Sequence, residues 1–260
     1  MFIDAIASYI TDFLKDHYIK VEVNEYTLGV KYSYVEILCR NKNYLGLSIT
    51  LVEDLVGSPW SFIEPSIDSL VPMATSINPY VKTLGIALLN ALSQYMIWEI
   101  GLPKNLYLEL DIDFFKAIAS FIEEPVVVIG NMALLVRRLG EEGFRDIVVL
   151  ERNPCYRMNC LPDTVAPRVI GRARTLIITG ATIVNDTIDQ ILSLARYSKK
   201  ILVGPTAAIY PKPVCDGLVD VIASMTPVDN DIVKKIIRAG GGRWSFHRYC
   251  RPYIIYGERI

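Results

Sequence analysis

The first third of the chain has two kinds of hydrophobic spacing. Apolar residues recur every three or four positions over residues 2–16, which predicts an amphipathic helix. Alternating β-branched and aromatic residues over 21–23 and 28–39 then predict two paired strands, with a turn near Asn24-Glu25. The chain therefore begins with a helix followed by an antiparallel strand pair.

A third strand and a long helix complete this part. Residues 44–51 have strand composition, and a loop-like stretch follows over 57–72. Asn78-Pro79 supplies an N-cap and a proline suited to the first helical position, so we expect a long helix that ends before Gly101. Strands and helices in separate blocks indicate a small α+β domain.

From Pro125 onward the pattern changes to short apolar runs separated by helical segments. Five runs have this character, at 126–129, 146–150, 175–179, 200–203 and 218–223. Strands that are apolar throughout are typical of a parallel sheet buried on both faces. We therefore expect a sheet of at least five parallel strands with helices on both faces, and a domain boundary within 103–125.

Composition narrows the class of protein. Of the 260 residues 52% are hydrophobic and 21% charged, which predicts a well-filled core and excludes global disorder. The net charge of -1 argues against a dedicated nucleic-acid binder, which normally carries a basic excess.

The location of the protein follows from its apolar and cysteine content. The longest uncharged stretch, 83–98, has 16 residues against the about 20 needed to span a membrane, so we expect a buried core helix there. Residues 1–4 lack a basic region followed by an apolar run, and we expect no secretory signal. The five cysteines are scattered, as in reduced proteins. We therefore expect a cytoplasmic protein.

Candidate chemistry lies at the strand ends. In an open parallel sheet, ligands bind beyond the carboxyl ends of the strands, where backbone amides and helix dipoles favour anions. Three strand ends have small or flexible residues, namely Gly130-Asn131, Thr179-Gly180 and Gly204-Pro205-Thr206. The alternative is that these glycines only permit tight turns.

Glu151 follows Gly130 by 21 residues, at the end of the second run. A dinucleotide or adenosyl site places a carboxylate about there, to accept hydrogen bonds from ribose hydroxyls. The chain has no GxGxxG after the first run, however, and Glu151 could equally cap a turn or pair with Arg152.

Two further segments leave alternatives open. Asn185, Asp186 and Thr187 lie at a strand-to-helix junction, where such residues either cap a helix or contact a ligand. The basic, aromatic segment 243–251 suits a surface or subunit contact better than a nucleic-acid site. The spacings of Cys155 with Cys160 and of His247 with Cys250 do not form a recognisable zinc site, and packed free thiols are favoured.

The order of several motifs resembles the putative heavy-metal chelation family. They are YLGLSITL (44–51), TSINPYVKTLGIALLNAL (75–92), VLERNP (149–154), LPDTVA (161–166), TGATIVNDTID (179–189) and GPTAAIYP (204–211). The resemblance covers nearly the whole chain. It implies an α/β fold in which an enolase-N-terminal-like α+β domain, residues 1–110, precedes a Rossmann-like parallel-sheet domain, residues 111–260.

The resemblance also implies a ligand site in the cleft between the domains, with genomic hints of a link to corrinoid biosynthesis. The ligand-binding residues that it implies are Asn78, Gly130, Glu151, Asp163, Thr179, Gly180, Asn185, Thr187, Gly204, Pro205 and Thr206. The strand-end pattern itself adds Asn131 and Asp186 as candidate ligand contacts. Asp186 stands where the family usually has glycine, and Ala207-Ala208 replaces a more polar pair.

These observations favour a protein that binds or processes a small anionic metal chelate or a heavy metal between its domains. Candidate metal contacts are Glu151, Asp163 and Asp186 with the thiols of Cys155 and Cys160. The alternatives are a transferase with an adenosyl or nicotinamide cofactor and a non-catalytic scaffold. We expect a small-molecule or metal-chelate partner and neither nucleic acid nor membrane. The sequence leaves open the metal, the reaction and whether the chain forms a homo-oligomer.

Overall fold

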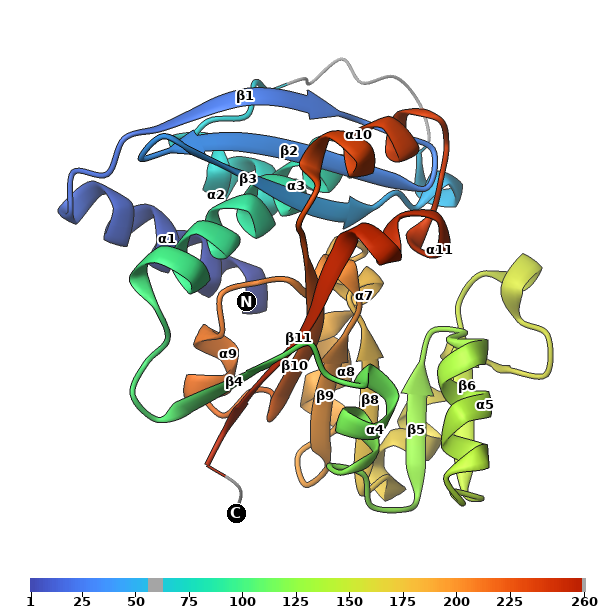
Figure 1. Ribbon diagram of the computed structural model, residues 1–260. Helices are drawn as coiled ribbons and strands as arrows, with labels where there is room; N and C mark the ends of the chain where they lie inside the picture. The colour runs from blue at the N-terminus through green and yellow to red at the C-terminus, as the bar shows by residue number, and fades with distance from the viewer. Residues whose placement is uncertain (56–62, 259–260) are drawn as a thin grey trace.

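The computed structural model describes residues 1–55 and 63–258, which form a mixed α/β fold with two sheets (Figure 1). The strands are β1 Val21–Thr27, β2 Tyr32–Cys39, β3 Lys42–Ile49, β4 Leu106–Leu110, β5 Val126–Ile129, β6 Ile147–Glu151, β7 Leu161–Pro162, β8 Thr175–Thr179, β9 Lys199–Val203, β10 Val221–Pro227 and β11 Cys250–Gly257. The helices are α1 Phe2–Asp16, α2 Leu70–Ala74, α3 Pro79–Tyr95, α4 Phe114–Ala119, α5 Ala133–Glu141, α6 Ala166–Val169, α7 Ala181–Val184, α8 Ile188–Leu194, α9 Lys212–Cys215, α10 Asn230–Arg238 and α11 Arg243–Phe246.

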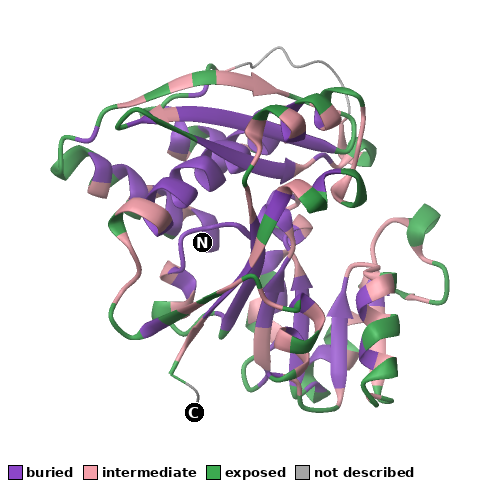
Figure 2. Ribbon diagram, in the orientation of Figure 1, coloured by how far each residue is buried: buried purple, intermediate pink, exposed green. Residues whose placement is uncertain are grey.

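The small sheet is antiparallel, in the order β1-β2-β3, and packs on α3. Helix α3 starts as its sequence predicts, because the Asn78 side chain accepts hydrogen bonds from the amides of Tyr80 and Val81. Every residue of α3 from 81 to 95 is buried, as Figure 2 shows. Gly46 of β3 allows this close packing, since a Cβ there would overlap the α3 backbone.

The large sheet has the order β4-β11-β10-β9-β8-β5-β6-β7. The six strands from β10 to β7 are parallel, and β11 and β4 extend the sheet in antiparallel fashion. Alternate residues of each strand pack on opposite faces. Val128 lies with α4 and α5 on one face, whereas Ile178 lies with α8 on the other. The predicted parallel sheet of at least five strands is confirmed.

Two local predictions differ from the structure. The turn predicted at Asn24-Glu25 is wrong: β1 continues to Thr27, and the polar pair lies at a register shift between Val23 and Glu25, a β-bulge. The loop predicted over 57–72 lies partly outside the described residues, and α2 occupies its end.

The two halves of the chain exchange elements. Strand β4, from the range expected to form the first domain, pairs with β11 at the edge of the large sheet. In return, α10 and α11 pack on the small sheet, where Phe246 and Ile237 join a cluster with Tyr32 and Leu47. The segment 243–251 is therefore folded into α11 and β11. Within the described ranges, every helix is too short or too polar to cross a membrane.

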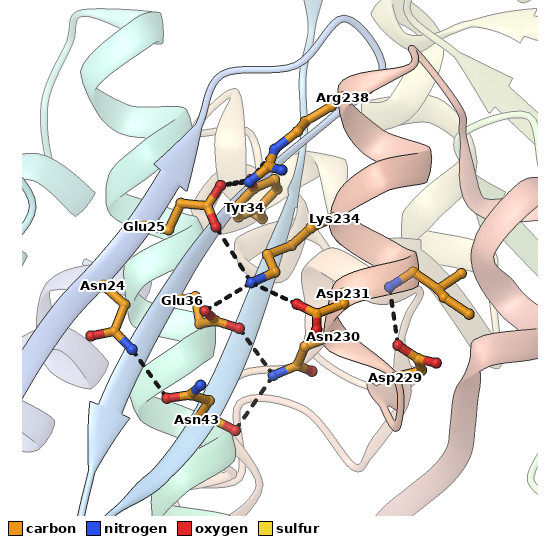
Figure 3. A network of polar contacts seen from close by, with 11 residues as sticks. Asn24, Glu25, Tyr34, Glu36, Asn43, Asp229, Asn230, Asp231, Lys234 and Arg238 are labelled. Carbon is orange, nitrogen blue, oxygen red and sulfur yellow. Dashed lines mark hydrogen bonds and ion pairs between the residues drawn. The ribbon is translucent and has the colours of Figure 1, made fainter.

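An ion network attaches α10 to the small sheet (Figure 3). Lys234 lies 2.9 Å from Glu36, 3.4 Å from Glu25 and 3.2 Å from Asp231. Arg238 forms an ion pair with Glu25 and donates to the hydroxyl of Tyr34 at 2.8 Å. Because Glu36 and Lys234 are both buried, their charges require each other.

Candidate functional site

A cavity of about 1020 Å³ lies between the two sheets. Its floor is formed by residues at the carboxyl ends of β5, β6, β8 and β9: Ile129, Leu150, Thr179 and Val203. The opposite wall comes from the β1–β2 turn, the end of β3 with the following turn, and α11. This is where an open parallel sheet binds ligands, and the volume suits a small organic molecule.

Nine of the residues that the sequence suggested as ligand contacts line this cavity. They are Gly130, Asn131, Glu151, Asp163, Thr179, Asn185, Thr187, Gly204 and Pro205. Gly130 and Gly204 have φ of +92° and +110°, where glycine is favoured, so the strand-end turns are built with glycine for a conformational reason. At Gly130 a Cβ would also lie 2.7 Å from Cγ2 of Thr179.

Glu151 fixes two strand-end turns to each other. One carboxylate oxygen accepts the amide of Asn131 and the other accepts the amide of Asn153, both at 2.7 Å. The Asn131 side chain in turn donates to the Tyr156 carbonyl at 2.6 Å. Glu151 thus lies at the strand end expected for a ribose-binding carboxylate, but each of its oxygens already accepts a backbone hydrogen bond.

The segment 185–187 combines a local turn with an ion pair to α3. The Asn185 side chain accepts hydrogen bonds from the amide and the hydroxyl of Thr187, at 3.2 and 2.7 Å. Asp186 has φ of +60°, the left-handed region, which explains why glycine suits this position. Its carboxylate forms an ion pair with Lys82 of α3, whose side chain is only 4% exposed.

Four of the suggested residues lie outside the cavity lining: Asn78, Gly180, Asp186 and Thr206. Asn78 caps α3. Thr206 joins the two sheets instead, because its hydroxyl accepts the amide of Ile49 at 2.8 Å and its carbonyl accepts Asn90 of α3 at 3.0 Å. Gly180 packs against the backbone of this same loop.

The wall on the side of the small sheet supplies cavity residues that the sequence did not suggest, among them Lys31, Tyr32 and Glu53. Burial raises the pKa of Tyr32 to about 12, so its hydroxyl keeps its proton at neutral pH. Glu53 and Asp54, which follow β3, both pair with Arg152 of the β6–β7 loop, with 3.6 and 2.5 Å between charged atoms. Glu53 and Asp54 follow the predicted strand 44–51 on the far side of the cavity from the parallel strand ends, so the strand-end pattern does not point to them.

Arg243 is the third cation at the cavity, after Lys31 and Arg152. Its guanidinium lies 5.2 Å from the ring centre of Phe114 and 5.0 Å from that of Trp244. Burial lowers its pKa, with Tyr32 acting in the opposite direction. The sequence feature that points to Arg243 is the run of glycines at 240–242. These glycines allow the sharp turn that brings α11 to the cavity.

The suggested metal contacts do not converge. Within residues 1–55 and 63–258, no three His, Cys, Asp or Glu side chains lie together as a metal site requires. Asp186 is paired with Lys82, and Cys155 is exposed. Burial and then the nearby Glu151 carboxylate raise the pKa of the Cys160 thiol, which favours its protonated form. These side chains do not fit a protein-only metal centre.

Known proteins share both the sequence and the fold. Two family models, each described as putative heavy-metal chelation, match residues 11–93 and 113–256. An uncharacterised protein of Methanocaldococcus jannaschii is 32% identical over 99% of both chains.

Two crystal structures of proteins of unknown function from the DUF364 family have the same fold. The protein from Pyrococcus horikoshii has a TM-score of 0.84 at 26% identity, covering 98% of this chain and 100% of its own. The protein from Desulfitobacterium hafniense, at 18% identity and a TM-score of 0.71 over 98% of both chains, shows the fold alone. The chain belongs to the putative heavy-metal chelation family.

Proposed function

We propose that the protein binds a small anionic metal chelate in the cavity between its two sheets. The observation that carries this proposal is the cavity itself, which four parallel-strand ends and the small domain enclose together. Its size is that of pockets for small organic ligands. Apolar residues, among them Ile49, Met132 and Val203, make up much of its lining, and three cations interrupt them.

In this proposal the metal arrives with its ligand. The ligand supplies the donor atoms, and the protein recognises the organic body and its charge. Lys31 and Arg243 favour a negative ligand. A corrinoid precursor is one chelate of this class to test, because the family resemblance implies a link to corrinoid biosynthesis.

The proposal predicts that filling the cavity abolishes chelate binding. Ala181 lines the cavity at the start of α7, so Ala181→Phe places a ring in the ligand volume. The matched control is Ala5→Phe, because Ala5 is an exposed helical residue of α1. Isothermal titration calorimetry measures the affinities for citrate, nitrilotriacetate and 8-hydroxyquinoline-5-sulfonate, each alone and as its cobalt or nickel complex, and for cobyrinic acid, which already contains cobalt.

We expect the wild type and Ala5→Phe to bind at least one metal complex in this panel, and Ala181→Phe to bind it at least tenfold more weakly. Equal affinity in all three proteins would place the binding elsewhere. Adenosylmethionine serves as the comparison ligand. Tight binding of adenosylmethionine, with no binding of any chelate, would overturn the proposal in favour of a transferase.

A further inference from the structure

We infer that Arg243, Lys31 and Tyr32 form an oxyanion-binding subsite in the small-domain wall of the cavity. The subsite receives a carboxylate, sulfonate or phosphate group of the ligand. This inference rests on the proposed function and adds to it the group by which the ligand is recognised. All three residues line the cavity, and they come from two segments far apart in the sequence.

Arg243 is the main element of the subsite because its guanidinium forms no ion pair with any carboxylate among the described residues. Its Nε is buried and has no hydrogen-bond partner within the described chain. The groups stacked on its guanidinium are the rings of Phe114 and Trp244. Aromatic faces attract a cation only modestly, whereas a half-buried charge such as that of Arg243 is costly without a counter-ion. A bound anion offsets that cost.

The other cations near the domain boundary are already neutralised. Arg152 pairs with Asp54 and Glu53, and Lys82 pairs with Asp186. An incoming anion would have to displace a carboxylate from either of them. Arg243 offers its N–H groups without such competition, and this difference singles it out among the buried or half-buried cations around the cavity.

Lys31 and Tyr32 complete the subsite from the β1–β2 turn. A Cβ on Gly242 would lie 3.3 Å from Cδ of Lys31, so the Lys31 side chain lies beside the residue that precedes Arg243. Tyr32 packs edge-on against Phe246 of α11, the short helix that begins at Arg243, with ring centres 5.1 Å apart. Its hydroxyl stays protonated below a pKa of about 12 and can donate to an anion.

The chemistry of the guanidinium defines the ligand class. Its planar fork of N–H donors matches the paired oxygens of carboxylate, sulfonate and phosphate. A free inorganic oxyanion and an oxyanion group on an organic ligand present the same chemistry. The first experiment therefore tests the subsite with inorganic phosphate, and the second compares organic probes that differ in one charged group.

Nuclear magnetic resonance observes the Arg243 Nε–H directly. Its cross-peak in the ¹H–¹⁵N spectrum of the full chain is assigned by its absence in Arg243→Lys. We expect inorganic phosphate to move this peak saturably at millimolar concentration, at constant ionic strength set with sodium chloride. The peak of Arg248, which is exposed on the same segment, should stay in place. A peak that moves without saturation, or not at all, would overturn the subsite.

The second experiment uses 8-hydroxyquinoline-5-sulfonate and the neutral 8-hydroxyquinoline as metal-free probes in calorimetry. Arg243→Met should weaken binding of the sulfonate by about 10- to 100-fold and leave the neutral probe within twofold, as expected for one charge-assisted contact. Arg248→Met is the control and should change neither affinity. Equal losses for both probes would mean that Arg243 only shapes the cavity.

The two proposals fail separately. If phosphate shifts the Arg243 peak but no chelate binds, the subsite stands and the chelate function falls. If chelates bind in the cavity with an affinity independent of Arg243, the function stands and the subsite falls.

Discussion

At the scale of single residues, two opposing effects on stability act at Asp186. Its backbone has φ of +60°, which costs an aspartate about 1 kcal/mol relative to glycine. Its carboxylate is the counter-ion of the buried Lys82 ammonium. Removing one partner of a buried pair costs about 3–5 kcal/mol, less here because Asp186 is 44% exposed. The charge term should therefore exceed the backbone term.

We expect Asp186→Gly to lower the free energy of unfolding by about 1–2 kcal/mol, despite the relief of backbone strain. The double variant Lys82→Met/Asp186→Gly should recover most of this loss, because it removes the unpaired charge as well. Urea unfolding of the wild type, both single variants and the double variant measures the coupling. Additive effects of the two substitutions would show that the pair contributes nothing.

The sequence predicted one wall of the cavity and not the other, for a physical reason. Gly130, Glu151 and Thr179 follow apolar runs, and parallel strands bring their carboxyl ends to one edge, so local pattern locates them. Lys31 and Arg243 reach the cavity only because distant segments meet. The contact between these segments depends on packing between the two halves of the chain. The spacing of apolar residues within one segment does not predict such packing.

At the scale of elements, α10 positions α11 at the cavity. Lys234 connects α10 to Glu36, which is only 6% exposed at its side chain, and to Glu25 and Asp231 (Figure 3). Burial acts to lower the pKa of Lys234, but its contacts with Glu36 and Asp231 outweigh burial and raise it. Because the pKa is raised in the folded state, this stabilisation is complete at neutral pH and is lost as the pH rises past that pKa.

Lys234→Met should destabilise the protein by about 3 kcal/mol at pH 7, because it leaves the Glu36 carboxylate buried without a cation. Lys235→Met is the matched control on the same helix, since Lys235 is exposed, and it should change stability by less than about 0.5 kcal/mol. Chemical denaturation at pH 7 compares the two. A similar small effect from both variants would contradict a structural role for the network.

The elements that the sequence located best are the strands with a continuous apolar centre. Strands β5, β8 and β9 were recognisable from continuous runs of Val, Ile and Leu. Strand β11 was not, because arginines and aromatic residues surround its short apolar centre, Ile254-Ile255, and give the segment the composition of a surface. The polar pair at the β1 bulge, Asn24-Glu25, resembles turn residues, so the sequence pattern predicts a turn where the strand continues.

At the scale of the whole molecule, the two sheets are joined by polar contacts as well as by exchanged elements. Asn90 of α3 donates to the carbonyls of Leu47 and Thr206, and Gln94 donates to the carbonyl of Ala208. These contacts hold the loop after β9, which includes cavity residues Gly204 and Pro205, against α3. Hydrogen bonds therefore join the two sheets on this side of the cavity, and the ion pair of Arg152 with Asp54 joins them on its other side.

The central claim is that this cavity holds an anionic metal chelate, and native mass spectrometry tests it most directly. The full-length protein and Ala181→Phe are each purified from the native host and weighed without denaturation, and again after denaturation. We predict that the native wild type carries an added small molecule with a metal isotope pattern, released on denaturation and missing from Ala181→Phe. Bare polypeptide mass for the wild type, or the same adduct on both proteins, would contradict the claim.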